Sequence, residues 1–302
     1  MLKSFLQELY PDELWYSIIA RYHFESGNFH ILDTMEDLFE ERRVPIFNIC
    51  LASNLSKPQS LAPPGVISCE RIIKDHTLAA FFSRNDADIM GKLMHYCEIR
   101  NNRHPSYSFG FINGYSLALR YCPLCQQEDR IKYGEPYWHK EHQISFIPYC
   151  IHHHCKLYEA PIPKNDFLAA RNLVRPQTKV IPAPTTFPYE SLVRELLYNP
   201  EILSFTEDDI LYAMEKAGYT EKVPFTLRVD DLLNDIQKDI GDYKFLHPFD
   251  LQWLSRRKRC ISNETWLILL GFLKDFMTHN TESFCRWYSK NYGLINKHRK
   301  NK

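Results

Sequence analysis

Two short-spaced pairs of cysteine and histidine constrain this chain more than any other feature. Cys122 and Cys125 are separated by two residues, and after a gap of 24 residues Cys150 and His153 repeat the spacing. Two such pairs can supply the four corners of a tetrahedron around one metal ion. Four soft or borderline ligands with no open position favour a structural zinc ion over a catalytic one. The pattern therefore predicts one structural zinc and directs the search for function towards recognition.

The identity of the fourth ligand is open at this stage. His152, His153 and His154 are adjacent and Cys155 follows them. The C-x2-H spacing favours His153, with Cys155 as the main rival and His154 third. His139 and His142 lie between the two pairs and are expected to make polar contacts, either with the ligands or elsewhere. The remaining cysteines stand alone and are expected to be small buried apolar residues: Cys50, Cys69, Cys97, Cys260 and Cys285.

Composition argues against several classes of protein. The chain has 302 residues, enough for one large domain or two ordinary ones, but only 10 glycines and no glycine-rich phosphate-binding motif. No apolar run approaches the roughly 18 residues of a membrane span, and the first residues lack the apolar core of a signal peptide. We therefore expect a soluble protein of the reducing cytoplasm.

Charge is balanced overall but unevenly placed. The formal net charge is zero, which argues against a non-specific nucleic-acid binder. Basic residues are concentrated late in the chain and are candidate phosphate contacts: Arg256, Arg257, Lys258, Arg259, Lys297, Arg299, Lys300 and Lys302. The alternative is a solvated helix end for the first four and a disordered tail for the others.

Hydrophobic periodicity predicts a mainly α fold with a small zinc-knuckle subdomain. We expect helices at 12–25, with Asp12 as N-cap, and at 30–41, 68–82 and 86–98, and a loop at 56–67. A proline-rich connection at 161–188 would separate a first domain, 1–160, from a helical domain, 189–302. The zinc subdomain would occupy 120–158. Within the second domain, helices at 205–217 and 227–240 are a candidate helix-turn-helix, with a small helical bundle as the alternative.

Three segments resemble the TniQ/TnsD family of transposon target-selection proteins. Residues 11–21 follow the pattern P-x-E-L-x-x-S-x-x-x-R, and residues 74–82 read KDHTLAAFF. From 122 to 153 the motifs C-P-x-C, G-x-x-Y-W, H-Q and C-x-x-H follow in the family's order. The extra histidines His152 and His154 depart from that pattern.

The resemblance implies a protein with no catalytic residues that selects an insertion site and recruits an AAA+ ATPase regulator of the transposase. It would contact target DNA directly, or dock on a CRISPR effector complex with its guide RNA. It would be a protein of the bacterial cytoplasm, nucleoid-associated when bound to DNA, without a small-molecule substrate. It also implies Cys122, Cys125, Cys150 and His153 as zinc ligands. Rival interpretations are a zinc-stabilised transcription factor, a protein-only adaptor and an enzyme. The segment His139–His142 does not have the spacing of a metallohydrolase helix, so we expect no enzymatic activity.

Overall fold

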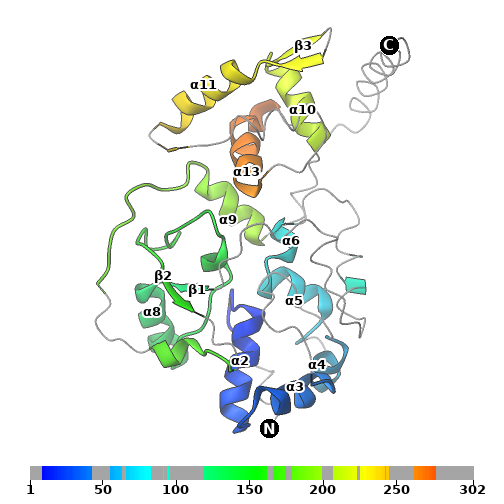
Figure 1. Cartoon of the computed structure of the whole chain (residues 1–302), viewed down its shortest axis with the longest axis vertical. Helices are drawn as coiled ribbons and strands as arrows, with labels where there is room; N and C mark the ends of the chain where they lie inside the picture. The colour runs from blue at the N-terminus through cyan, green and yellow to red at the C-terminus, as the bar shows by residue number, and fades with distance from the viewer. Residues whose placement is uncertain are drawn as a thin grey trace. The chain divides into compact units, whose positions relative to one another are not determined.

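The chain forms two compact units, described here from a computed structural model (Figure 1). Unit 1 comprises 1–83, 87–186 and 197–200, and unit 2 comprises 84–86, 187–196 and 201–302. The structure describes residues 9–42, 55–62, 66–82, 91, 94–95, 118–161, 166–173, 179–198, 207–222, 225–241, 243–244 and 262–276. Helices dominate these residues, as the periodicity predicts.

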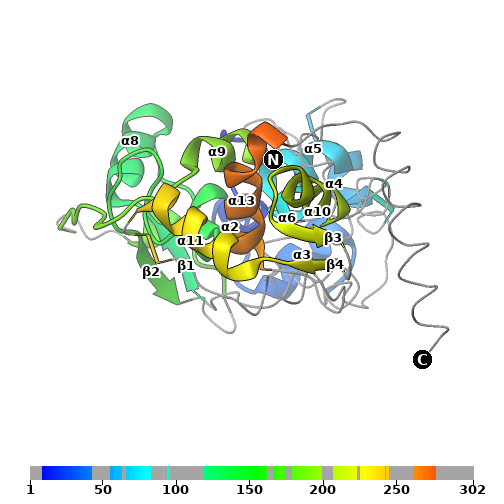
Figure 2. The same cartoon turned by 90° about the horizontal axis from the view of Figure 1, so that it is seen from above.

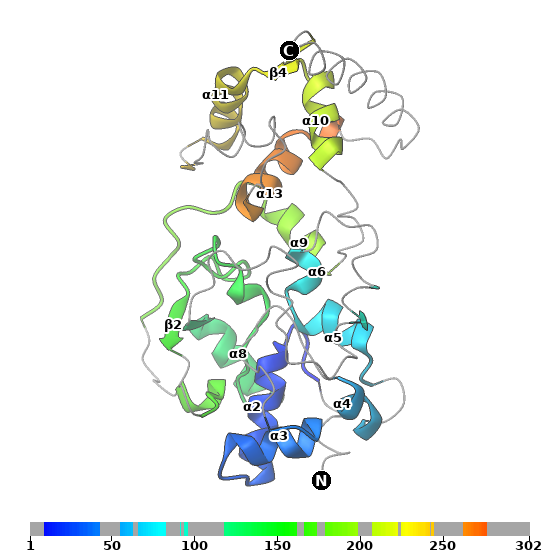
Figure 3. The ribbon, with the colours of Figure 1, turned by 45° about the vertical axis from the view of Figure 1, so that its right-hand side comes forward.

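Unit 1 combines short helices with one small antiparallel sheet. Helices α2, α3 and α4 are in contact in sequence order, as Figure 3 shows. The elements of this unit are α2 (Trp15–Ser26), α3 (Ile31–Phe39), α4 (Ser56–Leu61), α5 (Cys69–His76), α6 (Ala79–Phe82), β1 (Ala118–Tyr121), α8 (Pro123–Tyr133), η2 (Glu141–Gln143), β2 (Tyr158–Pro161) and η3 (Ala170–Leu173). Helix α9 (Glu190–Tyr198) begins in unit 2 and ends in unit 1.

Helix α2 begins later than predicted because Asp12 is not its N-cap. Asp12 has a φ of 57°, and its carboxylate accepts a hydrogen bond from the amide of Glu141 (3.1 Å). The helix starts at Trp15, after Leu14, without a side-chain cap. Leu14, Trp15 and Ile18, which recur at helical spacing, are buried. Gly27 ends the helix with a φ of 76°, in the left-handed region that glycine tolerates.

Two further boundaries differ from the predictions. Residues 56–61 form helix α4 rather than a loop, because Pro58 lies in the first turn, where no intrahelical amide donor is needed. The single helix predicted at 68–82 is broken into α5 and α6 at Thr77, which has extended backbone angles. The Thr77 hydroxyl donates to the carbonyl of Ile73 and accepts from the amide of Ala79, so it satisfies both helix ends. The helix predicted at 86–98 lies almost entirely outside the described residues.

Strands β1 and β2 pair antiparallel, with Ala118 opposite Pro161 and Tyr121 opposite Tyr158. Gln143 binds the middle of β1 with both ends of its side-chain amide. Its Oε1 accepts from the Arg120 amide (3.0 Å) and its Nε2 donates to the Arg120 carbonyl (2.9 Å). The Gln143 side chain thus acts like a neighbouring strand and fixes η2 against β1.

The described residues of the proline-rich connection that belong to unit 1 are, beyond β2, 166–173, which include the turn η3, and 179–186. Phe167 is buried, and the Trp138 indole donates to the Leu168 carbonyl (2.7 Å). Further on, the carbonyl of Ile181 accepts from the amide of Lys156 (2.8 Å). The connection therefore returns over the segment that follows Cys150.

Unit 2 contains α10 (Glu207–Lys216), β3 (Thr220–Lys222), β4 (Phe225–Leu227), α11 (Val229–Ile240), α13 (Asn263–Phe272) and η5 (Lys274–Phe276). The two helices of the candidate helix-turn-helix are present, but the β3–β4 hairpin joins them in place of a short turn (Figure 2). A helix-turn-helix is therefore not confirmed. The Tyr189 ring contacts Gly271 in the middle of α13.

Candidate metal centre

The first pair of cysteines lies where β1 passes into α8. Cys122 is the N-cap of α8, and its sulfur accepts a hydrogen bond from the amide of Cys125 (3.5 Å). Pro123 occupies the first helical position, where the missing amide hydrogen costs nothing. Hydrogen bonds from the Cys125 and Cys150 thiols lower the pKa of the Cys122 thiol. The helix N-terminus adds to this effect, so Cys122 is prepared to act as a thiolate ligand.

The second pair lies on a tight knuckle. The amide of Cys150 donates to the carbonyl of Cys155 (2.8 Å), and the amide of His154 donates to the carbonyl of Cys150 (2.9 Å). His154 has a φ of 45°, which closes the turn. Its ring lies near that of Tyr149, with centroids 6.3 Å apart. His153 is left on the side of the knuckle that faces α8.

The four residues favoured by the spacing meet at one point. One ligand atom from each of Cys122, Cys125, Cys150 and His153 lies within 4.8 Å of every other. His153 Nδ1 is 3.6, 3.3 and 3.6 Å from the three sulfurs, in sequence order, and the sulfurs of Cys125 and Cys150 are 3.6 Å apart. Sulfurs at 2.3 Å from a tetrahedral ion would be about 3.7 Å apart. The donor set and its spacing therefore fit one tetrahedral ion.

A carboxylate orients the histidine of this cluster. His153 Nε2 lies 3.0 Å from Glu128 Oε1, on the exposed side of α8. A hydrogen bond to Glu128 places the proton on Nε2 and leaves the Nδ1 lone pair directed at the sulfurs. Metal-bound histidines are commonly held by a carboxylate in this way.

Cys155 comes close to the cluster without joining it. Its sulfur is 3.4 Å from that of Cys122, but it is not among the atoms that all lie within 4.8 Å of one another. Cys155 is buried together with Leu157 against the three cluster cysteines. Its position suits a small apolar residue behind the site.

The two histidines between the pairs make different contacts. His142 is buried, and its Nε2 lies 3.6 Å from the sulfur of Cys125. Burial lowers the pKa of His142 well below its ordinary value. His139 Nε2 lies 2.9 Å from Asp129 and its Nδ1 lies 3.7 Å from Asp12. Burial opposes charge on His139, but these two carboxylates outweigh it and raise the pKa of His139 to about 10.

A buried ion pair joins α2 to the segment before the knuckle. Arg21 Nε and Nη2 donate to the two oxygens of Glu13 at 2.8 and 3.0 Å, and Nη1 donates to Glu135 at 3.2 Å. Burial raises the pKa of Glu13, although Arg21 opposes this. Ser17, one turn before Arg21, accepts a hydrogen bond from the amide of Trp138 (3.1 Å). The Glu-Ser-Arg pattern of residues 13–21 thus makes a structural contact with the segment between the two Cys/His pairs.

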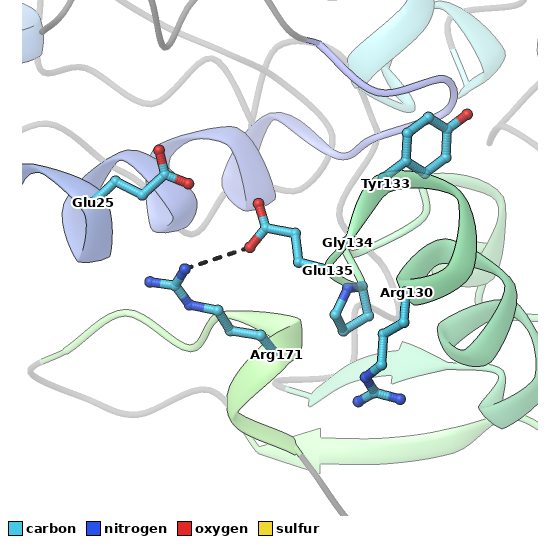
Figure 4. A pocket seen from close by; sticks show the side chains of 7 residues that line it. Glu25, Arg130, Tyr133, Gly134, Glu135 and Arg171 are labelled. Atoms are coloured by element: carbon cyan, nitrogen blue, oxygen red, sulfur yellow. Dashed lines mark hydrogen bonds and ion pairs between the residues drawn. The ribbon is translucent and has the colours of Figure 1, made fainter.

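An open surface pocket of about 490 Å³ lies beside this ion pair (Figure 4). Glu135 and Arg171 face each other at its edge, 3.4 Å apart. Glu25, Arg130 and Tyr133 also line it. Acidic and basic groups balance one another there, and we assign it no ligand.

The basic residues singled out in the sequence cannot be placed. Arg256, Arg257, Lys258, Arg259, Lys297, Arg299, Lys300 and Lys302 lie outside the described residues. Within the described ranges, no helix has the length and apolar character needed to cross a bilayer.

Comparison with known proteins gives two matches. Residues 5–157 match the TniQ family. The chain is also similar to the transposon Tn7 transposition protein TnsD of Escherichia coli, with 27% identity over 150 residues. That similarity covers 48% of this chain and 29% of the Tn7 protein, so the matched part is less than a third of that relative. The TniQ match spans more than half of the chain and includes all four residues of the Cys/His cluster, and the chain therefore belongs to the TniQ family.

Proposed function

We propose that this protein is a target-site selection factor of a bacterial transposon, acting by binding and not by catalysis. The observation that carries the proposal is the TniQ match over residues 5–157, together with the similarity to a Tn7 transposition protein. The metal cluster is consistent with it, because four protein ligands leave no open position for a reacting group.

We propose that the cluster binds one structural zinc ion through Cys122, Cys125, Cys150 and His153. Three sulfurs and one imidazole nitrogen are the ligands that zinc prefers. The ion would tie the start of α8 to the knuckle and, through Ser17 and Arg21, support the packing of α2. Zinc would thus contribute to the folding of unit 1 and take no part in a reaction.

We place recruitment of an AAA+ ATPase regulator in unit 1 and contact with target DNA in the chain beyond it. The distribution of charge in unit 2 indicates which part of it could contact DNA. Helix α10 carries Glu207, Asp208, Asp209 and Glu215, and α11 carries Asp230, Asp231, Asp235 and Asp239, against one lysine each. Acidic helices are repelled by phosphates, so this pair is a poor candidate for a groove. The basic run 256–259 and the basic tail are better candidates.

DNA binding is tested by gel shift at physiological salt, with transposon insertion-site DNA compared with random DNA. We expect preferential binding of the insertion site. The double variant Arg256→Glu and Arg257→Glu should weaken binding and flatten its salt dependence, by up to roughly one phosphate per lost contact. Lys238→Glu, on the acidic helix α11, is the matched control and should bind like the wild type. Unchanged affinity and salt dependence in the double variant would exclude the basic run as a contact.

A protein-only version remains as the second candidate. The net charge of zero suits an adaptor that docks on a CRISPR RNA-guided effector and reads no DNA itself. Capture of the ATPase without any DNA binding by the purified chain would favour that version. A zinc-stabilised transcription factor would instead bind DNA and leave the ATPase unbound.

A further inference from the structure

A second group of metal-ligand atoms lies beside the first. Glu141, His142 and Cys150 each place one ligand atom within 4.8 Å of the other two. Glu141 and His142 come from the turn η2, and Cys150 comes from the knuckle. All three residues are buried. The group is therefore an enclosed set of one oxygen, one nitrogen and one sulfur donor.

Glu141 is the feature that the first site does not explain. Both of its carboxylate oxygens are buried, and neither accepts a hydrogen bond. An enclosed carboxylate without donors is costly, because water no longer solvates its charge. A cation bound by the Glu141 carboxylate would remove that cost.

The distances around Glu141 are also compatible with ligands of one ion. Its Oε1 is 3.0 Å from His152 Nε2 and 3.7 Å from His142 Nε2. Neither contact has the geometry of a hydrogen bond. In the first cluster the ligand atoms are separated by a similar 3.3 to 3.6 Å. His152 lies on the exposed side, with 40% of its side chain accessible, so an ion could enter past it.

Local charge also favours a second cation. Three thiolates around one divalent ion leave a net charge of about −1, and the carboxylate of Glu141 adds another. The nearby cation His139 is already shared between Asp12 and Asp129. Lys140 interacts electrostatically with Glu141, and His152 lies 3.0 Å from it, so a second cation would share with them the balancing of this negative charge.

We propose that Glu141, His142 and Cys150 bind a second divalent cation, with the Cys150 thiolate shared between the two ions and His152 completing the coordination. The mixture of oxygen, nitrogen and sulfur donors is of the kind that zinc accepts. This ion would join η2 to the knuckle. The site goes beyond the role in target selection and does not depend on it.

The test is a titration of the reduced, full-length chain with zinc, followed by removal of free metal and elemental analysis. We expect two ions per chain in the wild type and one in Glu141→Gln. His152→Ala should lower the affinity for the second ion by at least about tenfold and leave the binding of the first ion unchanged. Matched controls are Glu159→Gln and His30→Ala, which alter exposed residues of the same kinds and should keep two ions.

Cobalt titration separates the two sites by their spectra. The first equivalent should give intense sulfur-to-metal absorption from three thiolates, and the second should add a weaker band that Glu141→Gln abolishes. Retention of the first band also shows that the variant is folded. Saturation of the wild type at one ion, or two ions in both Glu141→Gln and His152→Ala, would overturn the proposal and leave His152 as the charge partner of Glu141. A chain that bound no metal would contradict the first site as well.

Discussion

At the scale of single residues, the Glu13–Arg21 pair shows how a charge is held inside unit 1. Both side chains are at most 5% exposed, and Arg21 is the main partner of Glu13. Replacing Arg21 by methionine leaves the Glu13 carboxylate buried without its cation. We expect this variant to lower the free energy of unfolding by about 3–5 kcal/mol, measured by urea denaturation.

Arg42 provides the matched control for this prediction. It pairs with Asp33 at 3.1 Å, but 60% of its side chain is exposed. Exposed ion pairs contribute about 0–1 kcal/mol, so Arg42→Ala should leave the urea midpoint nearly unchanged. Equal effects of Arg21→Met and Arg42→Ala would show that the Glu13–Arg21 pair is solvated.

Two single-residue variants test which residue is the fourth ligand of the proposed zinc ion. His153→Ala removes the nitrogen that lies 3.3 to 3.6 Å from three sulfurs. We expect this variant to lower the affinity for the first ion by at least about tenfold. Cys155→Ser should keep that ion, because Cys155 lies outside the cluster. Competition with a zinc chelator measures both affinities. Loss of the ion in Cys155→Ser with retention in His153→Ala would make Cys155 the ligand.

Local spacing was enough to predict that Cys122, Cys125, Cys150 and His153 come together, since C-x2-C and C-x2-H are short-range patterns. It could not show that Glu13, Lys140 and Glu141 would be buried. Charged residues are usually exposed, and their burial here depends on contacts with partners far away in the sequence. Lys140, for example, donates to the carbonyl of Lys74 at 2.8 Å.

At the scale of elements, α13 depends on one glycine. A Cβ atom at Gly271 would lie 2.3 Å from Cγ of the Tyr189 ring. Cγ is close to the Tyr189 backbone, so the ring could not move away without a shift of that backbone. Alanine is the better helix former by about 1 kcal/mol, but overpacking costs about 1–3 kcal/mol. We therefore expect Gly271→Ala to lower the thermal stability of unit 2, as measured by calorimetry.

The double variant Gly271→Ala and Tyr189→Ala tests the cause of that loss. Removing the ring should make the alanine at 271 neutral or favourable relative to Tyr189→Ala alone. A stabilising effect of Gly271→Ala in the presence of Tyr189 would contradict the close contact.

Periodicity predicted the existence of most described helices but misjudged ends that side-chain contacts decide. The Thr77 hydroxyl breaks one predicted helix into two, and Asp12 bonds Glu141 instead of capping α2. The β3–β4 hairpin was missed because its strands have only three residues each. Such short runs carry too little alternation to be distinguished from a loop.

At the scale of the whole molecule, stability should depend on pH in two opposite directions. The pKa of His139 is raised to about 10 by Asp12 and Asp129 against the effect of burial, so its contribution is complete below pH 6.5 and is lost between pH 6.5 and 10. Burial lowers the pKa of His76 to about 4, so its contribution is present above pH 6.5 and is lost as the pH falls towards 4. We expect maximal stability near pH 6.5.

Two glutamine variants separate these slopes when unfolding is followed at saturating zinc from pH 5.5 to 9.5. His139→Gln should remove part of the alkaline slope, which for one group cannot exceed about 1.4 kcal/mol per pH unit. His76→Gln should flatten the acid side alone. An alkaline slope of unchanged steepness in His139→Gln would show that other groups cause the loss of stability at high pH.

The proposed function is recruitment of an AAA+ ATPase to the transposon's insertion site, and a recruitment assay tests it most directly. The target would be immobilised insertion-site DNA, free or bound by the guide complex, and the AAA+ ATPase of the same transposon would be added with or without this chain. The claim predicts that the ATPase is retained on insertion-site DNA only when the chain is present, and that Cys122→Ser abolishes retention by unfolding unit 1. Equal retention without the chain, or equal retention on random DNA, would contradict it.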